Sequence, residues 1–195
     1  MTLITLVRHG QTDWNLARRI QGSTDIPLND TGRADALAAA DILAAAGSYD
    51  AVYASPLVRA QETAQIIANR LGLAEPVLTR GLREREFGEA EGTDSADYIA
   101  RYGGWHSEVP GAETLDQVRD RALDSLDRIV RASRRRSSPN QESIIVVTHG
   151  GVIRALLMHA SGGSLPRDGD LLRNGSVHRF VAEHATLRLL QPISG

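Results

Sequence analysis

Short apolar runs alternate along this chain with longer stretches in which apolar residues recur at helical spacing. Three of the runs are followed at once by polar or turn-forming residues: residues 3–7, 51–54 and 144–147. Continuous apolar runs of this length, bounded by turn signals, predict buried strands. The first and third predicted strands both lead directly into a His-Gly pair, at His9 and at His149. Weaker strands are predicted over residues 176–181 and 186–190.

The longer stretches predict four helices, which cover about residues 30–46, 56–71, 114–135 and 151–159. In the second, Ser55 is expected to be the N-cap and Pro56 the first helical residue, which places Arg59 in the first turn. In the third, Thr114 and Gln117 fit a capping box. Each helix has an apolar face that needs a partner to cover it.

Strands that alternate with helices of this length need crossover connections. The sequence therefore predicts an α/β fold, a three-layer sandwich with a mostly parallel central sheet and helices on both faces. Ligands of such folds bind outside the carboxyl ends of the strands, where this chain places its polar residues. We expect one domain over residues 1–195, with a lid-like excursion at about residues 83–112, where the patterning is poor and five glycines occur. Trp105 is expected to pack within that excursion, with contact to the substrate as the alternative.

Composition narrows the range of chemistry. A chain of 195 residues, 42% hydrophobic and 24% charged, has the composition of a globular protein. It has no cysteine, which excludes disulfides, thiolate metal sites and cysteine nucleophiles. The net charge of −2 argues against a sequence-independent nucleic-acid binder. The first apolar run becomes charged at Arg8, too early for a signal or membrane segment, so we expect no membrane association and a cytoplasmic location.

The residues at the ends of the predicted strands suit phosphoryl transfer. A histidine can attack phosphorus, and the planar guanidinium groups of Arg8 and Arg59 match the charged oxygens of a phosphate. Nearby arginines also lower the pKa of His9 by disfavouring its charged form, and His149 is placed to donate to the transferring oxygens. The alternatives are structural hydrogen bonds for a lone histidine and surface ion pairs for the arginines.

A metal site is the competing interpretation of the two histidines. Such a site usually needs a third histidine or a carboxylate cluster at ligand spacing, and the sequence contains no such motif. We therefore expect neither a metal nor another cofactor. The remaining histidines are interpreted as surface or core residues: His106, His159, His178 and His184.

Four motifs follow one another between residues 3 and 181. They are Leu6-Val7-Arg8-His9-Gly10-Gln11-Thr12-Asp13-Trp14-Asn15, then Gln21-Gly22 with Asp25-Ile26-Pro27-Leu28-Asn29 and Thr31-Gly32, then Ser55-Pro56-Leu57 with Arg59-Ala60, and Thr148-His149-Gly150-Gly151-Val152-Ile153-Arg154. In order and approximate spacing they resemble the histidine phosphatase superfamily, the phosphoglycerate mutase-like proteins. The last motif is similar to that of the phosphatase branch.

This resemblance implies that His9 becomes phosphohistidine. It implies a set of substrate-binding residues: Arg8, Asn15, Gln21, Gly22, Arg59, Arg83, His149 and Gly150. The family's catalytic acid aligns with Glu84, which would protonate the leaving oxygen and then activate water, and Glu86 is the alternative in a shifted register. Glu113 matches a Pro-Gly-x-Glu motif and is expected either to orient pocket arginines or to complement a helix dipole.

Two reactions remain open at this point. The resemblance implies that mutases carry a longer, basic insertion between the acid and the late helix, whereas here 28 residues separate Glu84 from Glu113. Hydrolysis of a small phosphorylated metabolite is therefore favoured, with a 2,3-bisphosphoglycerate-dependent phosphoglycerate mutase as the alternative. A non-catalytic phospho-ligand binder is the alternative from another class, and a homodimer is the assembly considered.

Overall fold

The computed structural model describes residues 1–104, 107–137, 139–167, 169–183 and 186–193. The predictions for Trp105, His106 and His184 concern residues outside these ranges. Within the ranges, no helix combines the length and the apolar character that crossing a membrane requires.

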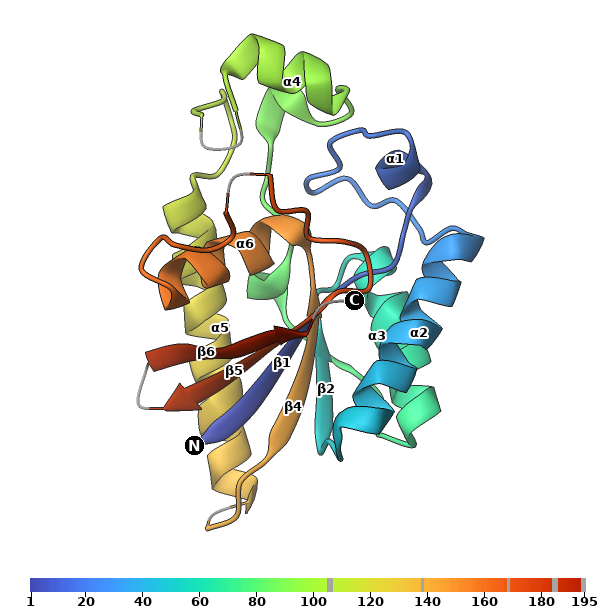
Figure 1. The fold of residues 1–195 in the computed structure, drawn as a ribbon, viewed down its shortest axis with the longest axis vertical. Coiled ribbons are helices and arrows are strands. Elements are labelled where there is room, and N and C mark those ends of the chain that lie inside the picture. Colours follow the sequence, from blue (N-terminus) through green and yellow to red (C-terminus); the bar gives the residue numbers. More distant parts are fainter. Residues whose placement is uncertain (105–106, 138, 168, 184–185, 194–195) are drawn as a thin grey trace.

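Six strands form one sheet in the order β3-β2-β4-β1-β5-β6 (Figure 1). They are β1 (Thr2–Arg8), β2 (Ala51–Ala54), β3 (Val77–Leu78), β4 (Ser143–Thr148), β5 (Val177–Glu183) and β6 (Thr186–Ile193). β4 pairs in parallel with β1 and with β2, whereas β5 runs antiparallel to β1 and to β6. Arg8 lies opposite Thr148 in the pairing of β1 with β4. The predicted mostly parallel sheet is confirmed, and its register brings the two His-Gly pairs to the same edge.

Helices cover both faces of the sheet, as predicted (Figure 1). The α-helices are α1 (Asp13–Leu16), α2 (Asp30–Ala46), α3 (Val58–Leu71), α4 (Ser95–Tyr102), α5 (Leu115–Ser137) and α6 (Gly150–Ala160), and two short 3-10 turns are η1 (Arg80–Leu82) and η2 (Gly88–Ala90). Side chains of a strand alternate between faces. In β4, Val147 therefore packs in the core shared with α2 and α3, and Val146 packs in the core shared with α5 and α6.

The helix after β2 begins later than predicted. Its N-cap is Leu57 and its first residue is Val58, so the expectation of an N-cap at Ser55 was wrong. The physical reason is that the Ser55 hydroxyl lies 2.8 Å from Nε2 of His149, a partner that local sequence cannot reveal. Arg59 is nevertheless in the first turn of α3, as predicted.

The start of α5 agrees with the predicted capping box. The backbone N–H of Thr114 donates to Oε1 of Gln117 (2.8 Å), and the backbone N–H of Gln117 donates to Oγ1 of Thr114 (3.1 Å).

The segment from residue 83 to residue 112 contains structure that the sequence pattern did not predict, namely η2 and the eight-residue α4. In Figure 1 α4 stands beyond the carboxyl ends of the strands. Tyr98 is the buried residue of α4, and it packs in a small apolar cluster of its own with Ile20, Phe87, Ala90 and Val109. One buried side chain leaves little apolar periodicity, which explains why the pattern of α4 was missed. The division into one domain and an excursion stays a prediction.

Candidate active site

Two buried imidazoles lie side by side where β1 and β4 end. The backbone N–H of His9 donates to the carbonyl of Thr148 (3.0 Å), so the parallel pairing continues into the loops. The ring centroids of His9 and His149 are 5.1 Å apart, and the ring planes are inclined by 58°. The exposed fractions are 2% for His9 and 0% for His149.

The tautomer of His9 follows from one hydrogen bond. Its Nδ1 lies 2.7 Å from the carbonyl oxygen of Gly10. A carbonyl oxygen only accepts, so Nδ1 carries the proton and the neutral ring has its lone pair on Nε2. His9 can therefore present Nε2 as a nucleophile.

His149 is held by Ser55, the residue that follows β2. Nε2 of His149 lies 2.8 Å from the Ser55 hydroxyl, which also accepts the backbone N–H of Leu57 (3.3 Å). The opposite nitrogen, Nδ1, is buried and has no hydrogen-bond partner among the described residues.

Both imidazoles are kept neutral at ordinary pH. Burial is the larger cause that lowers the pKa of His9 well below its usual value, and the charges of Arg59 and Arg8 lower it further. Burial and Arg59 lower the pKa of His149 in the same way. The predicted direction of the shift for His9 is confirmed, although burial contributes more than either arginine.

Arg59 is fully buried and its guanidinium is held by a loop that follows α1. NH1 donates to the carbonyl of Thr24 and NH2 to the carbonyl of Gly22, each at 2.8 Å. Gly22 has a φ of +53°, and a Cβ there would lie 2.1 Å from Oε1 of Glu91, so only glycine fits this turn. Nε of Arg59 has no hydrogen-bond partner among the described residues.

Arg8 approaches the same place from the end of β1. Its NH1 donates to the carbonyl of Leu172, and a Cβ added to Gly150 would lie 3.5 Å from its Cζ, so the guanidinium lies against the start of α6. Within the described part of the chain its buried Nε has no partner.

Three buried nitrogens at this site therefore lack a hydrogen-bond partner within the described ranges: Nε of Arg8, Nε of Arg59 and Nδ1 of His149. A buried donor without an acceptor costs about 1–3 kcal/mol, and more when it is charged. Two of the three belong to cations. An anion bound beside the two guanidiniums would balance their charge.

A carboxylate also reaches this site, from the end of η1. Oε1 of Glu84 accepts the backbone N–H of Gly151 (3.0 Å) and of Arg85 (2.9 Å). The first turn of α6, which is electropositive, thus holds the carboxylate. Glu84 also interacts electrostatically with Arg8 and Arg59. Glu86, the alternative in the shifted register, instead pairs with Arg83 (3.3 Å), and its side chain is 43% exposed.

The other predicted residues support the loop that follows β1. Thr12 Oγ1 donates to Oε1 of Gln21 (2.9 Å) and lies 3.2 Å from Oδ1 of Asn15, which ties these two side chains together.

Arg83, another predicted binding residue, is half-buried, and Nε of its guanidinium has no hydrogen-bond partner among the described residues.

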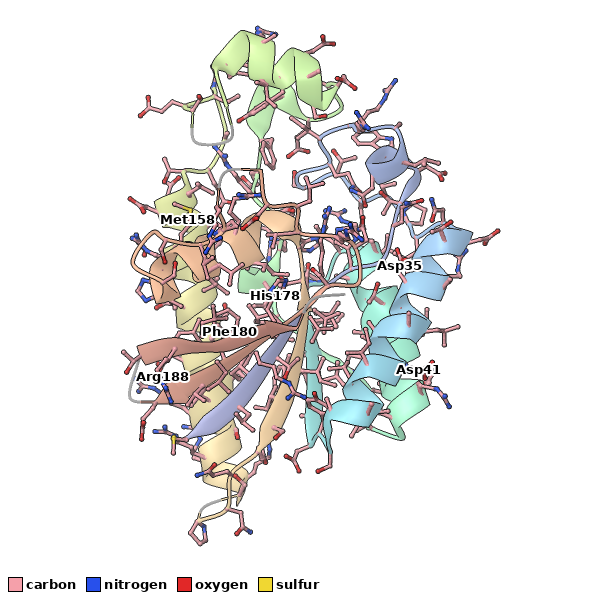
Figure 2. All side chains as sticks on the ribbon, in the orientation of Figure 1. Asp35, Asp41, Met158, His178, Phe180 and Arg188 are labelled. Carbon is pink, nitrogen blue, oxygen red and sulfur yellow. The ribbon has the colours of Figure 1, made fainter. Side chains whose placement is uncertain are left out.

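Three residues of the site carried no recognisable signal in the sequence. Asn174 donates from Nδ2 to the carbonyl of His9 (2.9 Å) and to Oδ1 of Asn15 (3.1 Å). Thr63 of α3 accepts the backbone N–H of Gly10 (3.1 Å). Asp35 of α2, labelled in Figure 2, accepts the backbone N–H of Gln11 (3.0 Å).

Glu113 does not bind a pocket arginine in an ion pair within the described ranges. Its carboxylate pairs with Arg121 of α5, at 2.7 Å from Nε, and accepts the backbone N–H of Glu86 (3.0 Å). Groups of three or more histidine, aspartate or glutamate side chains that could hold a metal ion do not occur among the described residues.

Comparison with known proteins identifies the class to which this chain belongs. A family model for the histidine phosphatase superfamily (branch 1) matches residues 4–192, and the chain belongs to that superfamily. The uncharacterized phosphatase PhoE of Bacillus subtilis is 40% identical over 84% of this chain and 79% of its own length. The metal-independent phosphoserine phosphatase of Arabidopsis thaliana is 37% identical over 84% of this chain and 71% of its own.

Solved structures agree with this assignment. A mycobacterial glucosyl-3-phosphoglycerate phosphatase, solved with VO3, superposes with a TM-score of 0.80 at 25% identity and covers 100% of this chain and 99% of that one. The relatives also include bacterial 2,3-bisphosphoglycerate-dependent phosphoglycerate mutases, at 31–36% identity. Phosphatases and mutases are therefore both found among the relatives of this chain.

Proposed function

We propose that this protein hydrolyses phosphomonoesters of small metabolites through a phosphohistidine formed on His9. The observation that carries the proposal is that Arg8, Arg59 and His149 lie around a histidine whose Nε2 is free of its proton: both arginine charges act on His9, and the two imidazole rings are 5.1 Å apart. Such donors fit the equatorial oxygens of a phosphoryl group, whose transfer depends on positioning and charge stabilisation.

In the first step the lone pair on Nε2 of His9 forms a bond to phosphorus while the bond from phosphorus to the leaving oxygen breaks. Glu84, entering as the carboxylic acid, gives its proton to that oxygen, and the alcohol departs. The arginines and Nδ1–H of His149 hold the three equatorial oxygens. For His149 to donate from Nδ1, its Nε2 accepts the hydrogen of the Ser55 hydroxyl.

In the second step Glu84, now a carboxylate, takes a proton from water. The water oxygen bonds to phosphorus, the nitrogen–phosphorus bond breaks, and inorganic phosphate is released with His9 restored. No step uses a metal ion. Arg83, Asn15, Gln21, Gly22 and Gly150 complete the binding surface in this proposal.

Transfer to water is favoured over transfer to a second substrate hydroxyl. The segment between Glu84 and Glu113 carries η2 and α4, and its arginines are Arg85 and Arg101. Arg85 donates from Nε to the carbonyl of Glu113 (2.7 Å), and Arg101 lies over the ring of Tyr102, 5.2 Å from its centroid. A second phosphate thus finds few cations here, although the mutase relatives make the mutase the second candidate.

The ligand that we propose is a small phosphorylated metabolite, and we propose no role for nucleic acid. We also propose a single domain over residues 1–195, which the extent of the family match supports. The expected homodimer and the cytoplasmic location stay predictions.

The test is a panel of phosphomonoesters, including phosphoserine and 3-phosphoglycerate, assayed for released phosphate. The last compound is also assayed for isomerisation with and without 2,3-bisphosphoglycerate. Release of phosphate supports the proposal, and isomerisation that requires the bisphosphate indicates a mutase. Binding of phosphate without either reaction indicates a non-catalytic binder.

A further inference from the structure

We propose that Arg121 of α5 is a positioning residue for the proton donor, because it holds the main chain around Glu84 in place. The inference rests on the proposed function, in which Glu84 gives the proton to the leaving oxygen. Arg121 lies outside every motif of the sequence analysis, and its guanidinium contacts residues 81–84 and Glu113.

Every N–H group of the Arg121 guanidinium is used. Nε and NH2 donate to the two carboxylate oxygens of Glu113, at 2.7 and 2.8 Å. NH1 donates to the carbonyls of Gly81 (2.9 Å) and Arg83 (2.7 Å), and NH2 also donates to the carbonyl of Glu84 (3.0 Å). An arginine has five such donors in a rigid plane, so using all five leaves the group one orientation.

Arg121 does not contact the carbonyl of Leu82, which a strand of the sheet holds instead. This carbonyl accepts a hydrogen bond from the hydroxyl of Thr148 at 2.7 Å. Thr148 is the last residue of β4 and directly precedes His149. Four consecutive carbonyls, from residue 81 to residue 84, are therefore fixed to α5 and to the strand that carries one of the two imidazoles.

Close packing leaves this segment little room to adjust. A Cβ added to Gly81 would lie 2.0 Å from Oγ of Ser125, so the main chain lies directly on α5. The pair of Arg121 with Glu113 is also well covered, with side chains 21% and 20% exposed.

Glu113 remains charged so that it can hold Arg121. Burial by itself raises the pKa of Glu113, but hydrogen bonds from Arg121 and from the backbone of Glu86 outweigh it and bring that pKa below its usual value. The carboxylate is therefore present at neutral pH.

A purely structural role and a positioning role predict different kinetics. If Arg121 only stabilised the fold, its loss would lower the rate with every substrate by the same factor. If it positions Glu84, its loss lowers kcat/KM for alkyl phosphates, whose alkoxide needs a proton, and spares 4-nitrophenyl phosphate, whose leaving group does not. The value of kcat/KM is used because it reports steps up to phosphorylation of His9 and not the later attack of water.

The experiment compares Arg121→Lys and Glu113→Gln with Arg119→Met as the matched control. Arg119 lies on the same helix and pairs at the surface with Asp116 and Asp120, so its loss removes one arginine without touching residues 81–84. Lysine keeps the charge but lacks the planar fork. We expect Arg121→Lys to lower kcat/KM for a simple alkyl phosphate by about tenfold to 100-fold. We expect the same variant to change kcat/KM for 4-nitrophenyl phosphate by less than about twofold. Glu113→Gln should lower kcat/KM for the alkyl phosphate by a smaller factor, and Arg119→Met should leave kcat/KM for both substrates unchanged.

Glu84→Gln, measured alongside, separates this inference from the proposed function. If Glu84→Gln lowers kcat/KM for both substrates by the same factor, the assignment of the proton donor fails. If Glu84→Gln lowers kcat/KM more for the alkyl phosphate, but the folded variants Arg121→Lys and Glu113→Gln do not, only the positioning role of Arg121 is overturned. Should Arg121→Lys fail to fold by circular dichroism, Glu113→Gln alone decides, because it weakens the same clamp and leaves the guanidinium in place.

Discussion

A methyl group added at Gly151 should move the proposed proton donor without harming the fold. A Cβ at this position would lie 2.4 Å from Oε1 of Glu84, whereas ordinary contact begins near 3.4 Å. The carboxylate oxygen must therefore retreat by about 1 Å in the Gly151→Ala variant, away from the N–H that it now accepts at 3.0 Å. The atom that must move is the end of a flexible side chain, so the backbone can stay in place.

The magnitude follows from the cost of misplacing a catalytic group. A displacement of about 1 Å can cost about 100-fold in the step concerned, or about 2.7 kcal/mol in its barrier. We expect kcat/KM for an alkyl phosphate to fall by about that factor and kcat/KM for 4-nitrophenyl phosphate to fall far less. Stability should change little, because the preference of a helix for alanine over glycine, about 1 kcal/mol, is offset by the hydrogen bond that the Glu84 carboxylate loses.

The assay is a double-mutant cycle with Glu84→Gln. If the methyl group acts through Glu84, adding Gly151→Ala to Glu84→Gln should change kcat/KM for the alkyl phosphate little. Urea unfolding of each variant serves as the control for folding. An equal loss with both substrates, or losses of the two variants that multiply, would refute the reasoning.

Four further predictions concern the nucleophile, the loop around Arg59, a buried histidine and metal dependence. His9→Ala should abolish the acid-labile label left by a radioactive phosphoester, and a label that persists would exclude His9 as the nucleophile. Glu91→Gln should raise KM about tenfold at unchanged folding, because the Glu91 carboxylate accepts N–H groups of the loop that holds Arg59; an unchanged KM contradicts this. Burial lowers the pKa of His178 to about 4, so the unfolded chain binds a proton below pH 6.5 that the folded chain takes up only near pH 4. His178 should therefore account for about 3 kcal/mol of the stability lost as pH falls through this range, in addition to the losses from His9 and His149, and His178→Gln should reduce the slope by that amount in urea unfolding at pH 7, 5.5 and 4. Activity should survive EDTA and be inhibited by vanadate, and loss of activity on chelation would show that a metal takes part.

Local sequence determined the elements that matter most to the site. The apolar runs that became β1, β2 and β4 are continuous because those strands are buried on both faces, and such runs are recognisable without any partner. The His-Gly pairs that follow two of them, and the order of the four motifs, also pointed to one edge of a parallel sheet and to the family. In the same way, Thr114 and Gln117 cap α5 through contacts only three residues apart.

Tertiary structure decided every contact between groups far apart in the chain. Ser55 has the local features of an N-cap, yet its hydroxyl is bound to His149, 94 residues away, and the helix starts at Val58 instead. Asn174 reaches the carbonyl of His9 from 165 residues away, and Arg121 clamps residues 81–84 from the opposite helix. Hydrophobic periodicity predicts which face of a helix or strand is buried, but it does not predict which side chains that face contacts. Those partners were set by the pairing of β1 with β4 and by the packing of α5, which no local pattern encodes.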